Sequence, residues 1–241
     1  MSARLPGPLL FVRYAYPPNA LGYCGPPDSA AFREYGRAGV LDPDLTRLAR
    51  SFSGAWPYLE LIAGRAGIAD PLDRRVVEAY WVGNPLLAAA EPDGPDGGLA
   101  HHSFHVLCVY PWVGLLDDRR KTDHALNVLD QCRIRWGRVT AVRGDRVAVR
   151  SRPLAWDGRR LSLGAPVVEA VGTAVDSAAA LAVGDWVSLH WHWVCDRLSD
   201  RQVRALRRYT RHHLDLVNDR IAVDTRTELS GSRGPADSNG R

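Results

Sequence analysis

A thiol and an imidazole lie beside predicted strands in the second half of the chain. Cys132 precedes one strand-like segment, and His190 lies inside another that begins at Gly184. A thiolate is a soft metal ligand and a neutral imidazole binds many transition metals, so the pair could hold a soft metal centre. Alternation along a strand would put His190 and His192 on one face, and either could supply the imidazole.

A second group of possible ligands lies in the first half. His101, His105 and Cys108 have i, i+4 and i+7 spacing, which would place them on one face of a helix in an arrangement that could bind metal. Cys24 lies between glycines in a predicted loop and could approach a ligand closely. Neither a carboxylate nor a cysteine pair completes the first three, and their neighbours are apolar, so packing is the favoured interpretation.

Composition narrows the class of protein. The 241 residues are 46% hydrophobic and 24% charged, which is typical of a globular protein. No apolar run reaches the roughly 18 residues that span a bilayer, and the start lacks a signal-peptide pattern. The four cysteines are too scattered for a disulfide framework. We therefore expect a cytoplasmic protein with reduced thiols and no membrane association.

Charge divides unevenly at Cys132. Residues 1–131 carry 12 Lys and Arg against 15 Asp and Glu, whereas residues 132–241 carry 19 against 12. A basic half could meet nucleic acid, a membrane surface or an acidic protein. The arginine-rich segment 201–211 has no interleaved aromatic platform on which bases could stack, which argues against nucleic acid as a partner.

The first half has helical periodicity. Apolar residues at three- and four-residue steps predict amphipathic helices over residues 43–66 and 71–90. The other elements expected are a structured loop at 8–27, a short helix from residue 28 or 29 to 37, a loop at 91–98, a buried helical pair broken near Pro111 within 101–116, and a helix at 123–130.

After Cys132 the hydrophobic pattern changes from helical periodicity to an alternation at every second residue. Short strands with hairpin turns are expected at residues 134–139, 147–154, 161–163, 167–171 and 184–194. Such a run favours a small closed barrel, because closure removes exposed strand edges. An amphipathic helix capped by Ser199 follows to residue 218. The predicted fold class is α+β, with a mainly helical domain at 1–131, a barrel and helix at 132–220, and a flexible tail at 221–241.

Two segments of the second half resemble a known family. Residues 132–139, Cys-Arg-Ile-Arg-Trp-Gly-Arg-Val, precede a Gly-Asp-Arg-Val turn at 144–147. Residues 183–190, Val-Gly-Asp-Trp-Val-Ser-Leu-His, precede the last helix. Their order and spacing resemble the HypC (HypC/HupF/HybG-type) family of small OB-like barrels, which are chaperones of NiFe-hydrogenase maturation. The resemblance covers about residues 132–215 and leaves the first half unassigned.

The resemblance implies a function and a site. Cys132 would hold an Fe(CN)2CO fragment through its thiolate, His190 would assist, and Gly137 and His192 would belong to the same site. The expected partners are a hydrogenase large-subunit precursor and a HypD-type maturation protein. The absence of phosphate-loop, nucleophile-elbow and paired-carboxylate patterns predicts that the protein is not an enzyme. The alternatives are a metal or redox-cofactor protein that uses His101, His105, Cys108 and Cys24, and a nucleic-acid-binding barrel.

Overall fold

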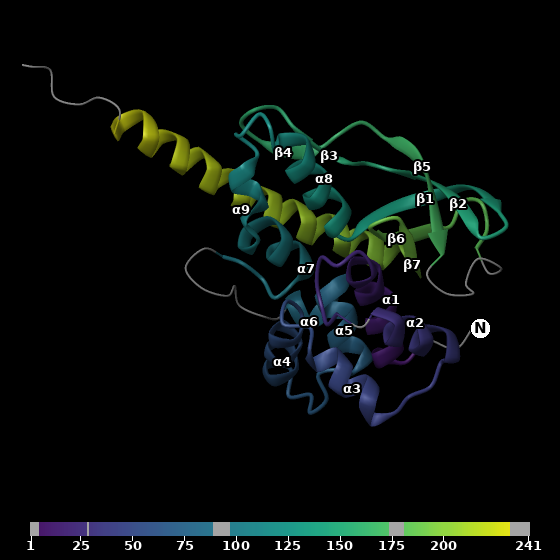
Figure 1. Cartoon of the computed structure of the whole chain (residues 1–241). Helices are drawn as coiled ribbons and strands as arrows, with labels where there is room; N and C mark the ends of the chain where they lie inside the picture. The colour runs from purple at the N-terminus through teal and green to yellow at the C-terminus, as the bar shows by residue number, and fades with distance from the viewer. Residues whose placement is uncertain (1–4, 28, 89–96, 174–180, 232–241) are drawn as a thin grey trace, which may run out of the picture.

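Helices fill the first half of the chain, and strands followed by one long helix fill the second (Figure 1). The structure, a computed structural model, describes residues 5–27, 29–88, 97–173 and 181–231. The predicted α+β class is confirmed: N-terminal helices accompany a closed five-stranded barrel and a C-terminal helix. Within the described ranges, no helix has both the length and the apolar character needed to cross a membrane.

Helices α2, α3 and α5 pack against α1. The bounds of the first six helices are α1 (Gly7–Ala20), α2 (Ser29–Ala38), α3 (Pro43–Arg50), α4 (Trp56–Arg65), α5 (Arg74–Trp81) and α6 (Pro85–Ala88). The predicted loop at residues 8–27 was wrong, because α1 occupies most of that segment and buries side chains on nearly every side. Its prolines are tolerated at the beginning and in the last turns. The two predicted long helices are each broken in two, and α2 ends before Gly39, whose φ is +65°.

Irregular helices connect the two halves. They are α7 (His102–Phe104), a π-helix η1 (His105–Val109), a 3-10 helix η2 (Pro111–Leu115) and α8 (Thr122–Cys132). The break near Pro111 is confirmed, because Tyr110 has an extended backbone between η1 and η2. Residues 91–96 of the predicted loop at 91–98 lie outside the described part of the chain.

The barrel has five strands, which are β1 (Arg135–Arg143), β2 (Arg146–Ser151), β5 (Val167–Thr173), β6 (Trp186–His190) and β7 (Trp193–Leu198). Their order is β1-β2-β5-β7-β6, closing back on β1, with only β5 and β7 parallel among these pairs. This is the order of a five-stranded OB barrel. Two details were wrong: the predicted last strand is split by a turn at Trp191, and residues 161–163 leave the barrel. They form β4 (Leu161–Leu163), paired with β3 (Leu154–Trp156).

A single helix, α9 (Asp200–Gly231), ends the described chain. Ser199 caps it as predicted, because its hydroxyl accepts from the Gln202 N–H and the Gln202 side chain accepts from the Ser199 N–H. The predicted end at residue 218 was too early. Asn218 does not stop the helix but pairs its side chain with the backbone of Leu161 on β4. Of the predicted tail, residues 232–241 lie outside the described part.

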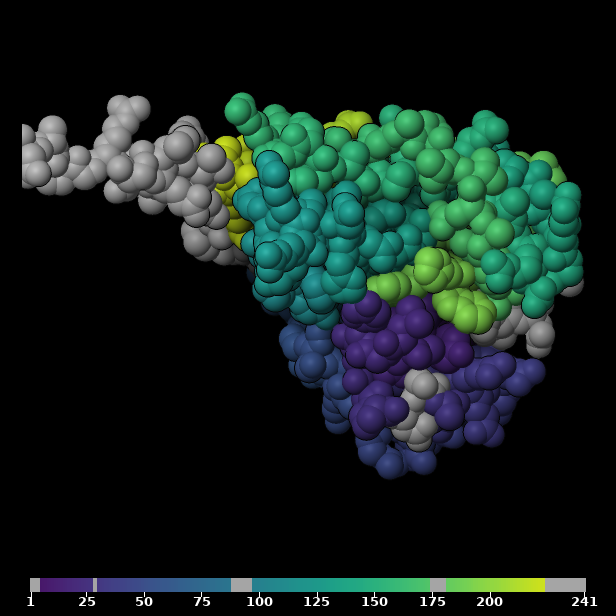
Figure 2. All heavy atoms as spheres, turned by 45° about the horizontal axis from the view of Figure 1, so that its top comes forward, coloured from purple at the N-terminus to yellow at the C-terminus, as the bar shows by residue number. Residues whose placement is uncertain are grey.

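Hydrophobic packing joins the two halves. The largest core includes α1, α4 and α5 together with Ile134, Cys195, Leu198 and Leu206 from the second half. In the space-filling view α1 lies directly against the yellow-green segment of β6 and β7 (Figure 2). The predicted boundary after residue 131 falls one residue before the end of α8, and the hydrophobic core continues across it.

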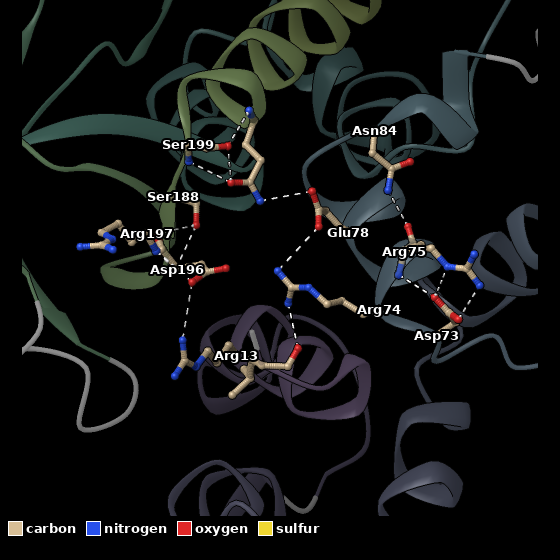
Figure 3. A network of polar contacts seen from close by, with 12 residues as sticks. Arg13, Asp73, Arg74, Arg75, Glu78, Asn84, Ser188, Asp196, Arg197 and Ser199 are labelled. Carbon is tan, nitrogen blue, oxygen red and sulfur yellow. Dashed lines mark hydrogen bonds and ion pairs between the residues drawn. The ribbon is translucent and has the colours of Figure 1, made fainter. Parts of the chain in front are cut away.

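Polar contacts cross the same junction (Figure 3). Arg13 of α1 lies 3.7 Å from Asp196 of β7, and Gln202 of α9 donates to Glu78 of α5 at 3.2 Å. The buried Tyr14 hydroxyl forms a hydrogen bond of 2.8 Å with Ser188 of β6. Helix α1 is therefore held in a fixed register against the strand that ends in His190.

Candidate metal centre

Three buried side chains converge where α7, α8 and β6 meet. One ligand atom each from His102, Cys132 and His190 lies within 4.8 Å of the others. Within the described part of the chain, no other group of three or more His, Cys, Asp or Glu side chains meets this criterion. Cys132 and His190 are the pair expected from the sequence, and His102 from the first half joins them. Two imidazoles and a thiol suit a soft or borderline metal.

Cys132 is positioned by the residues on either side of it. Helix α8 ends at Cys132, and β1 begins three residues later, beside β6. The Gln131 carbonyl accepts from the Trp191 N–H at 2.8 Å, which ties the residue before Cys132 to the residue after His190. Trp191 has φ +53°, the only positive value for a non-glycine residue among those described. Such a strained backbone persists only where its surroundings hold it.

The Arg135 side chain bonds to both of the residues joined in this way, Gln131 and Trp191. Its guanidinium donates to the Gln131 side chain at 2.8 Å and to the Trp191 carbonyl at 2.6 Å, and it also pairs with Glu169. The Arg135 side chain is only 2% exposed. The strained turn after His190 is therefore anchored by a buried cation.

His190 owes its orientation to α1. Its Nδ1–H donates to the Tyr14 carbonyl at 2.6 Å. Helical geometry would pair that carbonyl with the N–H of residue 18, but Pro18 has none, so the carbonyl is available. This bond leaves a lone pair on Nε2, which is buried and makes no hydrogen bond within the described residues. A carbonyl that fixes the tautomer of an imidazole is typical of metal-binding histidines.

His102 is bonded through both of its ring nitrogens. Its Nε2–H donates to the Cys132 carbonyl at 2.9 Å, and Nδ1 lies 3.1 Å from the Tyr80 hydroxyl. The Tyr80 hydroxyl also lies 3.1 Å from the Gly54 carbonyl, so its single proton can go either to that carbonyl or to His102 Nδ1. The Nδ1 lone pair of His102 is available to a metal only when the Tyr80 proton goes to Gly54, and the bond from Nε2–H to the Cys132 carbonyl orients the ring.

Burial sets the charge of the cluster. It lowers the pKa of His190 to about 4 and places the pKa of His102 well below its ordinary value. It also raises the pKa of the Cys132 thiol. Without a cation the cluster is neutral at pH 7: the imidazoles offer lone pairs and the thiol keeps its proton. A bound metal ion would displace that proton and stabilise the thiolate.

The other predicted ligands do not meet at one point. His101 Nδ1 lies 2.7 Å from the Ser103 hydroxyl, whereas His105 packs its ring against Tyr110. The Cys108 thiol faces the carbonyl of His213. The π-helix η1 begins at His105, so the spacing of an α-helix does not hold across these residues.

Two further residues that were expected to belong to the Cys132 site, His192 and Gly137, lie elsewhere. His192 is exposed in the turn between β6 and β7 and does not share the buried face of His190. Gly137 lies within β1, where an added Cβ would come within 2.7 Å of the Arg150 carbonyl, so it permits close strand packing rather than binding a ligand. His102 was missed because its sequence neighbours mark a helix but not the direction of its side chain.

A second buried histidine pair, His101 and His213, is bridged by Ser103 and fixes α9 against α7. The Ser103 hydroxyl lies 2.7 Å from Nδ1 of both His101 and His213, and burial lowers the pKa of these two histidines to about 3 and about 2. The unfolded chain protonates them near pH 6.5, and the folded chain does so only at much lower pH. The free energy of unfolding should therefore fall as the pH drops below 6.5, by about 1.4 kcal/mol per pH unit for each such histidine.

This pH dependence can be measured by urea denaturation at stepped pH between 7 and 4. In a His213→Gln variant, the slope of the free energy of unfolding against pH should correspond to about one proton fewer than in wild type. The exposed His192→Gln variant is the control for removal of an imidazole. An unchanged slope in His213→Gln would show that His213 is not kept neutral by folding.

The fold and the cluster together define a class: an OB-topology barrel fused to helices, with a buried Cys-His-His group able to hold a metal. The chain belongs to the DUF6390 family, described as a family of unknown function, whose model matches residues 3–94 and 92–224. No curated protein and no solved structure matches the chain. The family match covers the helical half as well as the barrel.

Proposed function

We propose that this protein is an accessory factor of NiFe-hydrogenase maturation, not an enzyme, which acts in the cytoplasm by binding a large-subunit precursor or a HypD-type partner. The observation that supports the proposal is the convergence of Cys132 and His190. The resemblance to the HypC family assigns the iron-fragment site to these two positions, and in the structure they lie together beside a barrel of OB order.

The cargo in this proposal is an Fe(CN)2CO fragment, which is a soft, low-spin centre. The Cys132 thiolate suits it, and His190 and His102 add neutral imidazoles. Burial is the main cause that lowers the pKa of His190, and the positive charge of Arg135 lowers it further. The same positive potential would favour a fragment that carries anionic cyanide ligands.

Partner capture tests the proposal. The untagged partner, either a large-subunit precursor or a HypD-type protein, should be recovered with the wild-type chain and lost with a Cys132→Ala, His190→Ala double variant. A Cys108→Ala, His192→Ala double variant removes the same two residue types away from the cluster and should retain the partner. Equal recovery with both double variants would refute the assignment of the site, and no recovery with wild type would refute the partner.

A resident metal ion is the second candidate. It is favoured by burial, because Cys132, His102 and His190 are at most 4% exposed. A cargo site must open for delivery, whereas a permanent site need not. Elemental analysis of anaerobically purified protein distinguishes the two: one equivalent of zinc, iron or nickel that survives incubation with the hydrogenase precursor supports a resident ion, and release to the precursor supports cargo.

A further inference from the structure

Exposed arginines lie side by side on the outer face of the barrel. The valines next to them point into the barrel core, namely Val139, Val149 and Val187. Because side chains alternate along a strand, Arg138 of β1, Arg150 of β2 and Trp186 of β6 face outward. Arg138 is paired with Trp186 on one side and with Arg150 on the other. The two arginines are therefore direct neighbours on adjacent strands, where like charges repel.

Helix α9 adds positive charge beside the same residues. It packs against β1 and β7 (Figure 1). The Arg207 guanidinium of α9 lies 5.3 Å from the centre of the Trp186 ring, over which the Arg138 guanidinium also lies, at 4.4 Å. Arg204 and Arg211 are exposed and lie about one turn before and after Arg207, so they share its face of the helix. The arginines of α9 and those of the strands thus form one continuous arginine strip, which meets at Trp186.

The arginine strip has no carboxylate of its own to balance it. Within the part of the chain that the structure describes, no ion pair involves its five members, which are Arg138, Arg150, Arg204, Arg207 and Arg211. Asp185 precedes Trp186, but its carboxylate accepts from the Ala182 N–H and lies 3.7 Å from Arg197. Arg138 donates to the Gly184 carbonyl at 2.6 Å, which leaves its charge uncompensated. Such a concentration of exposed positive charge attracts an anionic partner.

The aromatic residues on this face favour carboxylates over nucleic acid. Single-stranded nucleic acids stack their bases on open aromatic rings. Trp136 and Trp186 are both half-buried, and each has a guanidinium over its ring, at 5.9 Å from Arg133 and at 4.4 Å from Arg138. A guanidinium stacked on a ring keeps its N–H edge free, and that edge matches a carboxylate with two parallel hydrogen bonds. The barrel is closed, so a partner must bind through side chains rather than by adding a strand.

We propose that the arginine strip binds an acidic, carboxylate-rich segment of a partner protein in an extended conformation. From β6 to β2 the strip crosses two strand spacings, about 10 Å. From Arg204 to Arg211 it runs about 10 Å along α9. An extended segment of about six to eight residues covers the resulting length of roughly 20 Å. The strip shares no residue with the Cys132 cluster, so this surface is separate from the proposed metal site.

Fluorescence polarisation of fluorescein-labelled octaglutamate tests the strip. At low salt the full-length wild type should bind octaglutamate but not octaglutamine with the same label, and binding should weaken as salt screens the charges. An Arg138→Gln, Arg207→Gln double variant should bind octaglutamate about tenfold more weakly, because two ion pairs of modest individual strength are lost. An Arg33→Gln, Arg37→Gln double variant removes two exposed arginines from α2 and should keep the wild-type affinity.

Three results would overturn the proposal. Octaglutamate could fail to bind wild type, or both double variants could weaken it equally, which would show an effect of net charge alone. Octathymidylate or phosphatidylserine vesicles could bind the strip more tightly than octaglutamate does, which would assign the strip to nucleic acid or to a membrane surface. A Cys132→Ala, His190→Ala variant should bind octaglutamate as wild type does, so the strip and the proposed function are judged separately. Circular dichroism of each variant confirms that the fold is retained.

Discussion

Replacing Cys132 with serine should weaken Co²⁺ binding by about 100-fold or more and abolish the thiolate-to-cobalt absorption. Cys132 supplies the only sulfur among the three converging ligands, and a hydroxyl is a poor substitute for a thiolate toward a soft or borderline ion. Loss of an outer partner of a metal ligand alone costs about 10- to 100-fold in affinity, so loss of the ligand itself should cost at least the upper value. Competition against a chromophoric chelator measures the change.

Cys195→Ser is the matched control for this experiment. Cys195 is as buried as Cys132, and burial raises the pKa of its thiol as well, but its sulfur faces backbone atoms of Trp193 and His190 and is not among the three converging ligand atoms. A Cys195→Ser variant should keep the cobalt affinity and spectrum. If both variants lost binding equally, general disturbance of the buried core would explain the loss and Cys132 would not be a ligand.

Replacing Arg135 with methionine should lower the free energy of unfolding by about 3 to 5 kcal/mol, the usual cost of removing one member of a buried ion pair. Methionine fills a similar volume but leaves the Glu169 carboxylate without its cation and the Trp191 carbonyl without its donor. The left-handed backbone of Trp191 would then lose one of its two anchors. Urea denaturation at pH 7 measures the change.

Arg146→Met is the control for loss of an arginine from the barrel. Arg146 is exposed at the β1–β2 hairpin and donates only to the Ala170 carbonyl among the bonds described for it, so its replacement should change stability by less than about 0.5 kcal/mol. Equal effects of the two substitutions would show that Arg135 does not anchor the turn after His190.

Local patterns in the sequence determined most of the secondary structure. Alternation after Cys132 predicted the strands of the barrel, and Ser199 marked the beginning of α9, where the structure shows that it caps the helix. The same reasoning failed for α1, because prolines and aromatic residues are typical of loops when no surrounding core is considered. It also failed at Trp191, where a left-handed residue divides one apparent strand into two.

The Cys132 and His190 pair was expected from the resemblance of two sequence segments to the HypC family, and the structure brings the two residues together because β1 lies beside β6. His102, the Tyr14 carbonyl and Arg135 were decided only by the tertiary structure. The direction of the His102 side chain depends on how α7 packs. The Tyr14 carbonyl has no helical partner because Pro18 lacks an N–H, and it reaches His190 only because α1 lies against β6. Contacts between residues so distant along the chain leave no periodic signal, since each side chain is aimed by packing rather than by its neighbours.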